Sequence, residues 1–298
     1  MVVLTLTALT MLAFATNSLL CRMALGGSLI DPVSFTTIRL VSGAVAFIAI
    51  SRLVAGREEP QSTKGSWGTG FALFAYAAAF SLAYVSLSTG MGALILFGAV
   101  QVTMIGAALT AGEHLTPAQW AGSIAAIGGL VYLVLPGISA PDPVGALLMC
   151  VSGIAWGVYS IRGKGVSAPV AMTAANFLRS APFAIVASAV ALSWAHLEPA
   201  GVLIAITSGT VTSGMGYVLW YRVLRSITTA QASIVQLAVP VIAAFGGVVF
   251  LSERVSTRLV AASAVILGGL AVAVITGHSA RRNGSGNNQP VQTGNGTR

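Results

Sequence analysis

The chain is patterned as long apolar runs separated by short polar joints. A helix needs about 20 apolar residues to cross the hydrocarbon core of a bilayer. Several joints carry residues typical of helix N-caps and first turns, such as Asp31 before Pro32 and Asp142 before Pro143. The pattern predicts ten membrane spans, at residues 2–24, 33–54, 67–87, 91–111, 116–135, 143–162, 168–193, 199–221, 230–251 and 257–277.

Composition supports an all-α integral membrane protein. Hydrophobic residues make up 56% of the 298 residues and charged residues only 7%, whereas soluble proteins carry roughly 25% charged residues. So few charges cannot cover a water-facing surface. The net charge of +8 comes from 15 Lys and Arg that are scattered between the apolar runs. Because they form no basic face or stripe, we do not expect a nucleic-acid partner.

The Lys and Arg positions predict the orientation of the chain. With a cytoplasmic N-terminus, ten of them fall in cytoplasmic segments and three in external ones, while Arg39 and Arg179 lie inside spans. The positive-inside rule therefore places both termini in the cytoplasm. Residues 278–298 are polar and rich in Gly and Asn, which predicts a disordered cytoplasmic tail.

A shift of 140 residues aligns the chain with itself without gaps, which predicts a first repeat at 1–137 and a second at 138–277. Each repeat holds five predicted spans, so the second enters the membrane from the opposite side. Such inverted repeats are typical of secondary transporters. The informative matches are Arg22 with Arg162, Arg39 with Arg179, and Glu113 with Glu253.

Two segments carry a resemblance to a known family, ALILFGAVQVTMIGAALTAGEHLTPAQWAGSIAAIGGLVYLV in the first half and ASIVQLAVPVIAAFGGVVFLSERVSTRLVAASAVILGGLAVAV in the second. They resemble the EamA type of the drug/metabolite transporter (DMT) superfamily, and within it the YddG-type exporters of aromatic amino acids and methyl viologen. The first copy departs from the second at the position that aligns with Pro240, where it has Val100. The recognisable parts are Pro240, Glu253, Gly268 and Gly269.

The resemblance implies a bacterial inner-membrane exporter whose central cavity is lined by spans 1, 3, 4, 6, 8 and 9. Spans 5 and 10 would then pack at the periphery or at a dimer interface, in a monomer or a homodimer. The expected partners are the lipid bilayer and a small-molecule substrate, an aromatic amino acid or an organic cation such as methyl viologen. Neither a cofactor nor a metal is implied.

Polar and aromatic side chains inside the spans are the candidates for the cavity. Polar groups in mid-span are costly unless they face a partner or a wet cavity, and aromatic rings suit a flat or cationic substrate. Tyr76 and Phe80 share one helix face, as do Phe97 with Gln101 and Trp156 with Tyr159. Packing and interhelical hydrogen bonds are the alternative roles for all of them. The cavity candidates are Asn17, Tyr76, Phe80, Phe97, Gln101, Trp156, Tyr159, Met215 and Gln236.

The charged residues of the spans leave two roles open. Arg39 and Arg179 could bind a substrate carboxylate, but their symmetry favours a structural role, because one substrate rarely needs two mirrored guanidinium groups. Glu113 and Glu253, at span ends on opposite sides, are structural or gating candidates. Pro240 removes a backbone hydrogen bond and is a candidate hinge.

Other function classes fit the sequence less well. An intramembrane enzyme would need a catalytic group at depth, whereas the three histidines lie at span ends or in the tail, so no catalytic residue is predicted. No Asp, Glu or His falls near mid-span, which predicts transport down the substrate gradient. The alternative within transporters is an exporter of nonaromatic amino acids or other small metabolites, with proton coupling.

Overall fold

The computed structural model describes residues 2–54, 65–110, 112, 116–135, 137, 140–163, 166, 168–227, 232, 235–236 and 238–285. The regular elements of this part of the chain are helices, joined by one isolated β-bridge between Ile30 and Leu197. They are α1 (Val2–Gly26), α2 (Pro32–Val54), α3 (Trp67–Tyr84), α4 (Thr89–Thr110), α5 (Pro117–Val134), α6 (Pro143–Gly163), α7 (Pro169–Val190), η1 (Leu192–Trp194), α8 (Pro199–Thr207), η2 (Ser208–Met215), α9 (Gly216–Ser226), α11 (Ala238–Leu251) and α12 (Thr257–Ser285).

Six of the described helices are long and apolar enough to cross a membrane, at Val2–Gly26, Pro32–Ile50, Thr89–Ala107, Pro143–Gly163, Val170–Val190 and Pro199–Ser226. Three shorter apolar helices accompany them, at Trp120–Leu133, Ala238–Leu251 and Thr257–Gly269. Large apolar side chains such as Phe245 and Phe250 are exposed on the outside of the bundle, where a soluble protein would carry polar groups. The all-helical membrane architecture is confirmed, while the count of ten spans stays a prediction.

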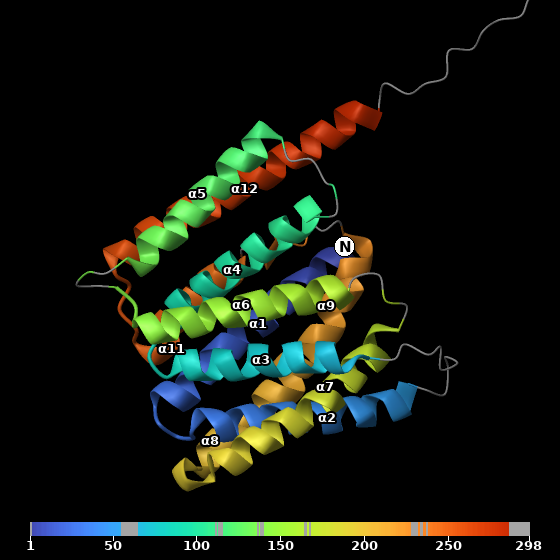
Figure 1. Cartoon of the computed structure of the whole chain (residues 1–298), viewed down its shortest axis with the longest axis vertical. Coiled ribbons are helices and arrows are strands. Elements are labelled where there is room, and N and C mark those ends of the chain that lie inside the picture. The colour runs from blue at the N-terminus through green and yellow to red at the C-terminus, as the bar shows by residue number, and fades with distance from the viewer. Residues whose placement is uncertain are drawn as a thin grey trace, which may run out of the picture.

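The helices run side by side, and α5 with α12 forms one edge of the bundle (Figure 1). These two helices pack mainly against each other, and their place at an edge agrees with the peripheral position that the resemblance implied for spans 5 and 10. α2, α7 and α8 form the opposite edge, and α1, α3, α4, α6, α9 and α11 lie between the two edges (Figure 1). Most of the buried aromatic side chains lie in this middle layer, so the centre of the bundle is the place for a site.

The helix starts confirm several predicted caps. The Asp31 carboxylate accepts the backbone N–H groups of Val33 at 3.0 Å and Ser34 at 2.8 Å, at the start of α2. It also accepts the backbone N–H of His196 at 3.1 Å and so ties this joint to the segment before α8. Burial raises the pKa of Asp31, but these hydrogen bonds outweigh burial and leave its pKa below the ordinary value.

Two predicted boundaries differ from the structure. The eighth span is a helical run from Pro199 to Ser226 whose middle, Ser208–Met215, is a π-helix. α12 continues to Ser285, and no Pro interrupts it between residues 278 and 285. Residues 278–285 of the predicted tail thus belong to this helix, and residues 286–298 lie outside the described part of the chain.

Candidate substrate cavity

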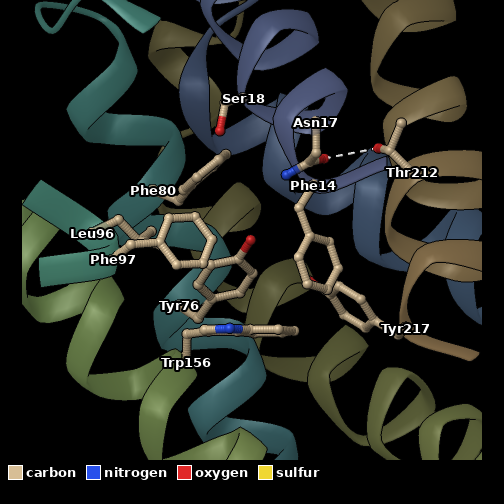
Figure 2. Close-up of a pocket in the computed structure, with 10 residues that line it drawn as sticks. All are labelled: Phe14, Asn17, Ser18, Tyr76, Phe80, Leu96, Phe97, Trp156, Thr212 and Tyr217. Atoms are coloured by element: carbon tan, nitrogen blue, oxygen red, sulfur yellow. Dashed lines mark hydrogen bonds between the residues drawn. The ribbon is translucent and has the colours of Figure 1, made fainter. Parts of the chain in front are cut away.

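A small cavity of about 20 Å³ lies at the centre of the bundle. Every residue that lines it is buried. Figure 2 shows its side chains converging from α1, α3, α4, α6 and the run from η2 to α9. The lining residues are Phe14, Asn17, Ser18, Tyr76, Phe80, Leu96, Phe97, Trp156, Thr212 and Tyr217.

Aromatic rings in mutual contact form most of the wall. The Trp156 indole lies at the centre of this group, with its ring centroid 5.0 Å from that of Tyr76, 4.9 Å from that of Tyr217 and 5.5 Å from that of Phe14. Phe80 continues the wall, 5.4 Å from Tyr76. Ring pairs at these separations stabilise each other in tilted or edge-on arrangements. The wall therefore offers flat apolar surfaces to a ligand from several directions.

Asn17 supplies the polar part of the wall. Its Oδ1 accepts the hydroxyl of Ser208 at 2.7 Å and that of Thr212 at 3.0 Å. Both hydroxyls come from the π-helix η2, and π-helical turns inside longer helices are frequent at functional sites. The amide nitrogen of Asn17 is directed into the cavity, while its oxygen faces Thr212 (Figure 2). The hydrogen bonds to η2 thus leave the two N–H donors of the amide for a ligand.

Gln236 holds Trp156 in place from behind the wall. The indole Nε1 donates to Gln236 Oε1 at 3.4 Å, and the Gln236 amide donates in turn to the carbonyl oxygen of Ala232 at 3.2 Å. Gln236 is fully buried. Because indole N–H groups are usually paired when they are buried, Gln236 fixes the orientation of the ring.

A buried arginine lies directly behind two of the lining tyrosines. Arg39 of α2 is 1% exposed. Its Nη2 donates to the hydroxyl of Tyr76 at 3.3 Å and to that of Tyr217 at 3.5 Å, and its Nε donates to Ser213 Oγ at 3.0 Å. Its guanidinium carbon is 5.3 Å from the centroid of the Tyr76 ring and 5.2 Å from that of Phe80. A positive charge therefore lies beside the cavity, in contact with its wall.

The structure brings together five of the nine predicted cavity residues. Asn17, Tyr76, Phe80, Phe97 and Trp156 line the cavity. Tyr159 is buried beside it, 5.7 Å from Trp156 between ring centroids, and Gln236 lies behind Trp156. All five lining residues come from the spans that the resemblance implied.

Two predicted residues lie elsewhere, and these expectations are corrected. Gln101 is buried on the face of α4 that meets α5, where it lines a separate space with Ser123 and Leu130. Met215 is 54% exposed on the outside of the bundle. Thr212 and Tyr217 line the cavity from this part of the chain instead. Pro240 is buried in α11, and its hinge role stays a prediction.

Five lining residues were not predicted. Phe14 and Ser18 lie three residues before and one residue after Asn17, and Phe14 shares a helix face with Asn17, which is a signal that could have identified Phe14. Tyr217 lies at the end of the π-helix, so the ordinary helical spacing does not give its direction. Leu96 and Thr212 complete the set, and their residue types are too common in apolar spans to stand out.

A charged network ties helix ends together at one end of the bundle. Glu253 accepts the backbone N–H of Thr89 with both carboxylate oxygens, at 3.0 and 2.9 Å. Arg22 pairs with Glu253 at 3.3 Å and donates to the carbonyl oxygens of Tyr84 and Val85 at 3.0 and 2.9 Å. The network links α1, α3, α4 and the residues after α11. The partner predicted for the other side, Glu113, lies outside the described residues.

A buried aromatic cavity between the helices of an apolar bundle is typical of a membrane transporter. Residues 143–275 match the model of the EamA-like transporter family. The chain is 48% identical over 270 residues to an uncharacterized protein of Pseudomonas aeruginosa, which covers 90% of this chain and 93% of that protein. The protein belongs to the EamA-like transporter family.

Two further comparisons agree with this assignment. The chain is 27% identical over 209 residues to an uncharacterized transporter of Archaeoglobus fulgidus, over 68% of this chain and 74% of that one. The fold is similar to that of a crystal structure with 21% sequence identity, with a TM-score of 0.65 over 93% of this chain and 97% of the other. The last likeness concerns the fold alone.

Proposed function

We propose that this transporter exports small amphipathic metabolites across a bacterial inner membrane, with aromatic amino acids as the best-fitting substrates. The observation that carries the proposal is the cavity itself. Phe14, Tyr76, Phe80, Trp156 and Tyr217 surround it with ring faces and edges (Figure 2). Its volume of about 20 Å³ is far below the roughly 300–1,000 Å³ of small-molecule sites, so the helices must move apart for a substrate to enter. Flat rings pack well between such walls.

Alternating access between two inverted repeats is the proposed mechanism, and the packing of the helices supports it. Under the shift of 140 residues, α3 corresponds to the run from α8 to α9, and α1 corresponds to α6. α3 packs against α6, and the run from α8 to α9 packs against α1. α4 packs against α6 as α11 packs against α1, and α2 meets α7 as α5 meets α12. Two halves with matching contacts can exchange their shapes and so expose the cavity to either side.

The arrangement of the helix ends supports cytoplasmic termini. The start of α1 and the end of α12 lie on the same side of the bundle as the end of α6 and the end of α9 (Figure 1). Arg162 is in the last turn of α6 and Arg225 in the last turn of α9. We assign this side to the cytoplasm. The Arg22–Glu253 network then closes the external side of the cavity. Under the shift, Arg162 corresponds to Arg22 and Glu113 to Glu253, so we propose these two residues as the cytoplasmic counterpart.

We propose that the concentration gradient of the substrate alone drives transport. Among the described residues, the buried polar side chains include Asn, Gln, Ser, Thr and Arg but no Asp, Glu or His. A proton-coupled transporter carries such a group at depth. The competing candidate is a proton-coupled exporter of nonaromatic amino acids. Its transport would depend on a pH gradient, whereas the transport proposed here would not.

Transport into proteoliposomes tests the proposal. Uptake of labelled phenylalanine, threonine and a viologen is compared with and without an imposed pH gradient, for the native chain and for Trp156→Ala. Trp120→Ala is the matched control, because Trp120 lies in α5 and is largely exposed. We expect phenylalanine uptake without a pH gradient, and its loss by about tenfold or more in Trp156→Ala alone, since a buried ring contributes several kcal/mol of contact. Uptake of threonine only, or only with a pH gradient, would contradict the proposal.

A further inference from the structure

Arg39 is a buried charge with no charged partner in the described part of the chain. No described Asp or Glu lies within 4.0 Å of its guanidinium, because the ion pairs found there are Arg22 with Glu253 and His196 with Glu198. Its Nη1 has no hydrogen-bond partner at all. Removing a guanidinium from water without a counter-charge is costly, and an ionisable group inside a membrane span marks a functional site whose partner should be identified.

The contacts of Arg39 direct hydrogen-bond donors towards the cavity. A tyrosine hydroxyl has one proton to donate and lone pairs that accept. The hydroxyl oxygens of Tyr76 and Tyr217 both accept hydrogen bonds from Arg39, so their protons stay available for donation. Both hydroxyls lie within 3.5 Å of the same Arg39 nitrogen, and even when one hydroxyl donates to the other, the second proton remains. A hydroxyl that accepts from a cation is a stronger donor, because hydrogen bonds in a chain polarise one another.

Asn17 also presents hydrogen-bond donors to the cavity. Its oxygen is occupied by the hydroxyls of Ser208 and Thr212, so the amide presents its N–H groups to the cavity (Figure 2). The cavity thus combines amide and hydroxyl donors with a nearby positive charge, and none of its lining residues is acidic.

We infer that the cavity recognises its substrate by a carboxylate, which Asn17 and the tyrosine hydroxyls bind and which supplies the counter-charge of Arg39. The inference rests on the proposed function and makes it more specific: the substrate class is a carboxylic acid with a flat apolar body. An amine is not required, and an organic dication such as a viologen is repelled. A guanidinium with only a structural role would have its donors on carbonyl oxygens, as Arg179 has at Ala175.

Three ligands that share a phenyl ring test the roles of the carboxylate and the amine separately. They are 3-phenylpropionate, which carries only the carboxylate, phenethylamine, which carries only the amine, and phenylalanine, which carries both. Equilibrium binding to the purified full chain is measured by calorimetry for the native protein, Arg39→Gln, Asn17→Asp and the matched control Arg179→Gln. Thermal unfolding of each variant reports whether it is folded. Asn17→Asp preserves the shape of the side chain and keeps the test available if Arg39→Gln does not fold.

The native chain and Arg179→Gln should bind 3-phenylpropionate about tenfold or more tightly than phenethylamine, as expected for charge-assisted hydrogen bonds. Arg39→Gln should lose this preference. Asn17→Asp should reverse it, because its own carboxylate then occupies the place of the substrate's. Equal binding of acid and amine by the native chain would overturn the carboxylate inference and leave the aromatic proposal standing. Failure of all three ligands to bind would overturn both.

Discussion

Arg39 and Arg179 occupy equivalent positions in the two halves of the sequence but lie in different surroundings. Arg39 is enclosed by aromatic rings and hydroxyls beside the cavity, and one of its nitrogens has no partner. Arg179 of α7 is only partly buried, and its Nη1 donates to the carbonyl oxygen of Ala175 one turn earlier at 3.1 Å. The symmetry that favoured a structural role for both therefore describes Arg179 better than Arg39.

The difference follows from the residues that the repeat places around each arginine. Arg39 donates to Ser213, Tyr76 and Tyr217. Under the shift of 140 residues, the corresponding positions around Arg179 are Leu73, Gly216 and Ala77, none of which has a side-chain hydroxyl. The three hydroxyl groups that contact Arg39 therefore have no counterparts around Arg179. In the proposed mechanism, the inverted repeat supplies the symmetric motion, and the site depends on positions at which the two halves differ.

The largest expected effects come from substitutions of the glycines that pack against the two arginines. A Cβ at Gly209 would collide with the backbone carbonyl of Arg39, and a Cβ at Gly70 would lie 2.7 Å from the Cβ of Arg179. Both Gly209→Ala and Gly70→Ala should lower stability by about 1–3 kcal/mol, because extra volume in a packed interface forces the helices apart. Thermal unfolding measures this cost.

Only Gly209→Ala should also change the preference of the cavity for carboxylates, because only this substitution displaces the helix that carries Arg39. The preference is measured as the ratio of the affinities for 3-phenylpropionate and phenethylamine. Gly268→Ala is the control for the change of residue type, since a Cβ there meets nothing within 4 Å. An equal change of the ratio in Gly70→Ala would show that the two arginines act alike.

The sequence was informative where a simple periodicity links it to structure. Apolar runs and the Asp31 and Asp142 joints gave the helix starts, because a capping carboxylate and a following proline act locally. The steps of four in α3 placed Tyr76 and Phe80 together on the cavity side. Charge spacing also identified Arg22, Arg39 and Glu253, although not their partners.

The faces of the helices could not be predicted in the same way. In a membrane bundle, lipid and the neighbouring helix are both apolar, so the sequence of α4 does not show that Gln101 turns towards α5. The π-helix at Ser208–Met215 shifts the residues that follow it to another face. For this reason Met215 was placed in the cavity and Tyr217 was missed.

A smaller effect is expected from the charged network at the proposed external end of the cavity. Glu253→Gln removes the charge that joins Arg22 to the N–H of Thr89, which should weaken the closure of the proposed external side. Cys21 precedes Arg22 and is fully buried, so its labelling by a membrane-impermeant thiol reagent in intact cells reports on this closure. In a Cys150→Ser background, labelling should rise about fivefold, as for the loss of a charge-assisted hydrogen bond. Glu198→Gln, an equivalent change near the exposed His196, should leave the labelling unchanged, and a rise in both variants would argue against a specific gate.

The smallest effect concerns the starts of the helices that carry the two arginines. α2 is capped by Asp31, whereas α7 begins at Ala168 without a side-chain cap. Asp31→Ala should therefore destabilise the protein by about 1 kcal/mol at neutral pH, and Ala168→Asp should stabilise it by a similar or smaller amount. Because the pKa of folded Asp31 is lowered from 3.8, its contribution is present above that value and is lost as the pH falls through the folded-state pKa. Thermal unfolding in detergent should thus show the gap between the native chain and Asp31→Ala closing as the pH falls below 3.8, and a gap that is independent of pH would mean that packing, and not the carboxylate charge, stabilises the start of α2.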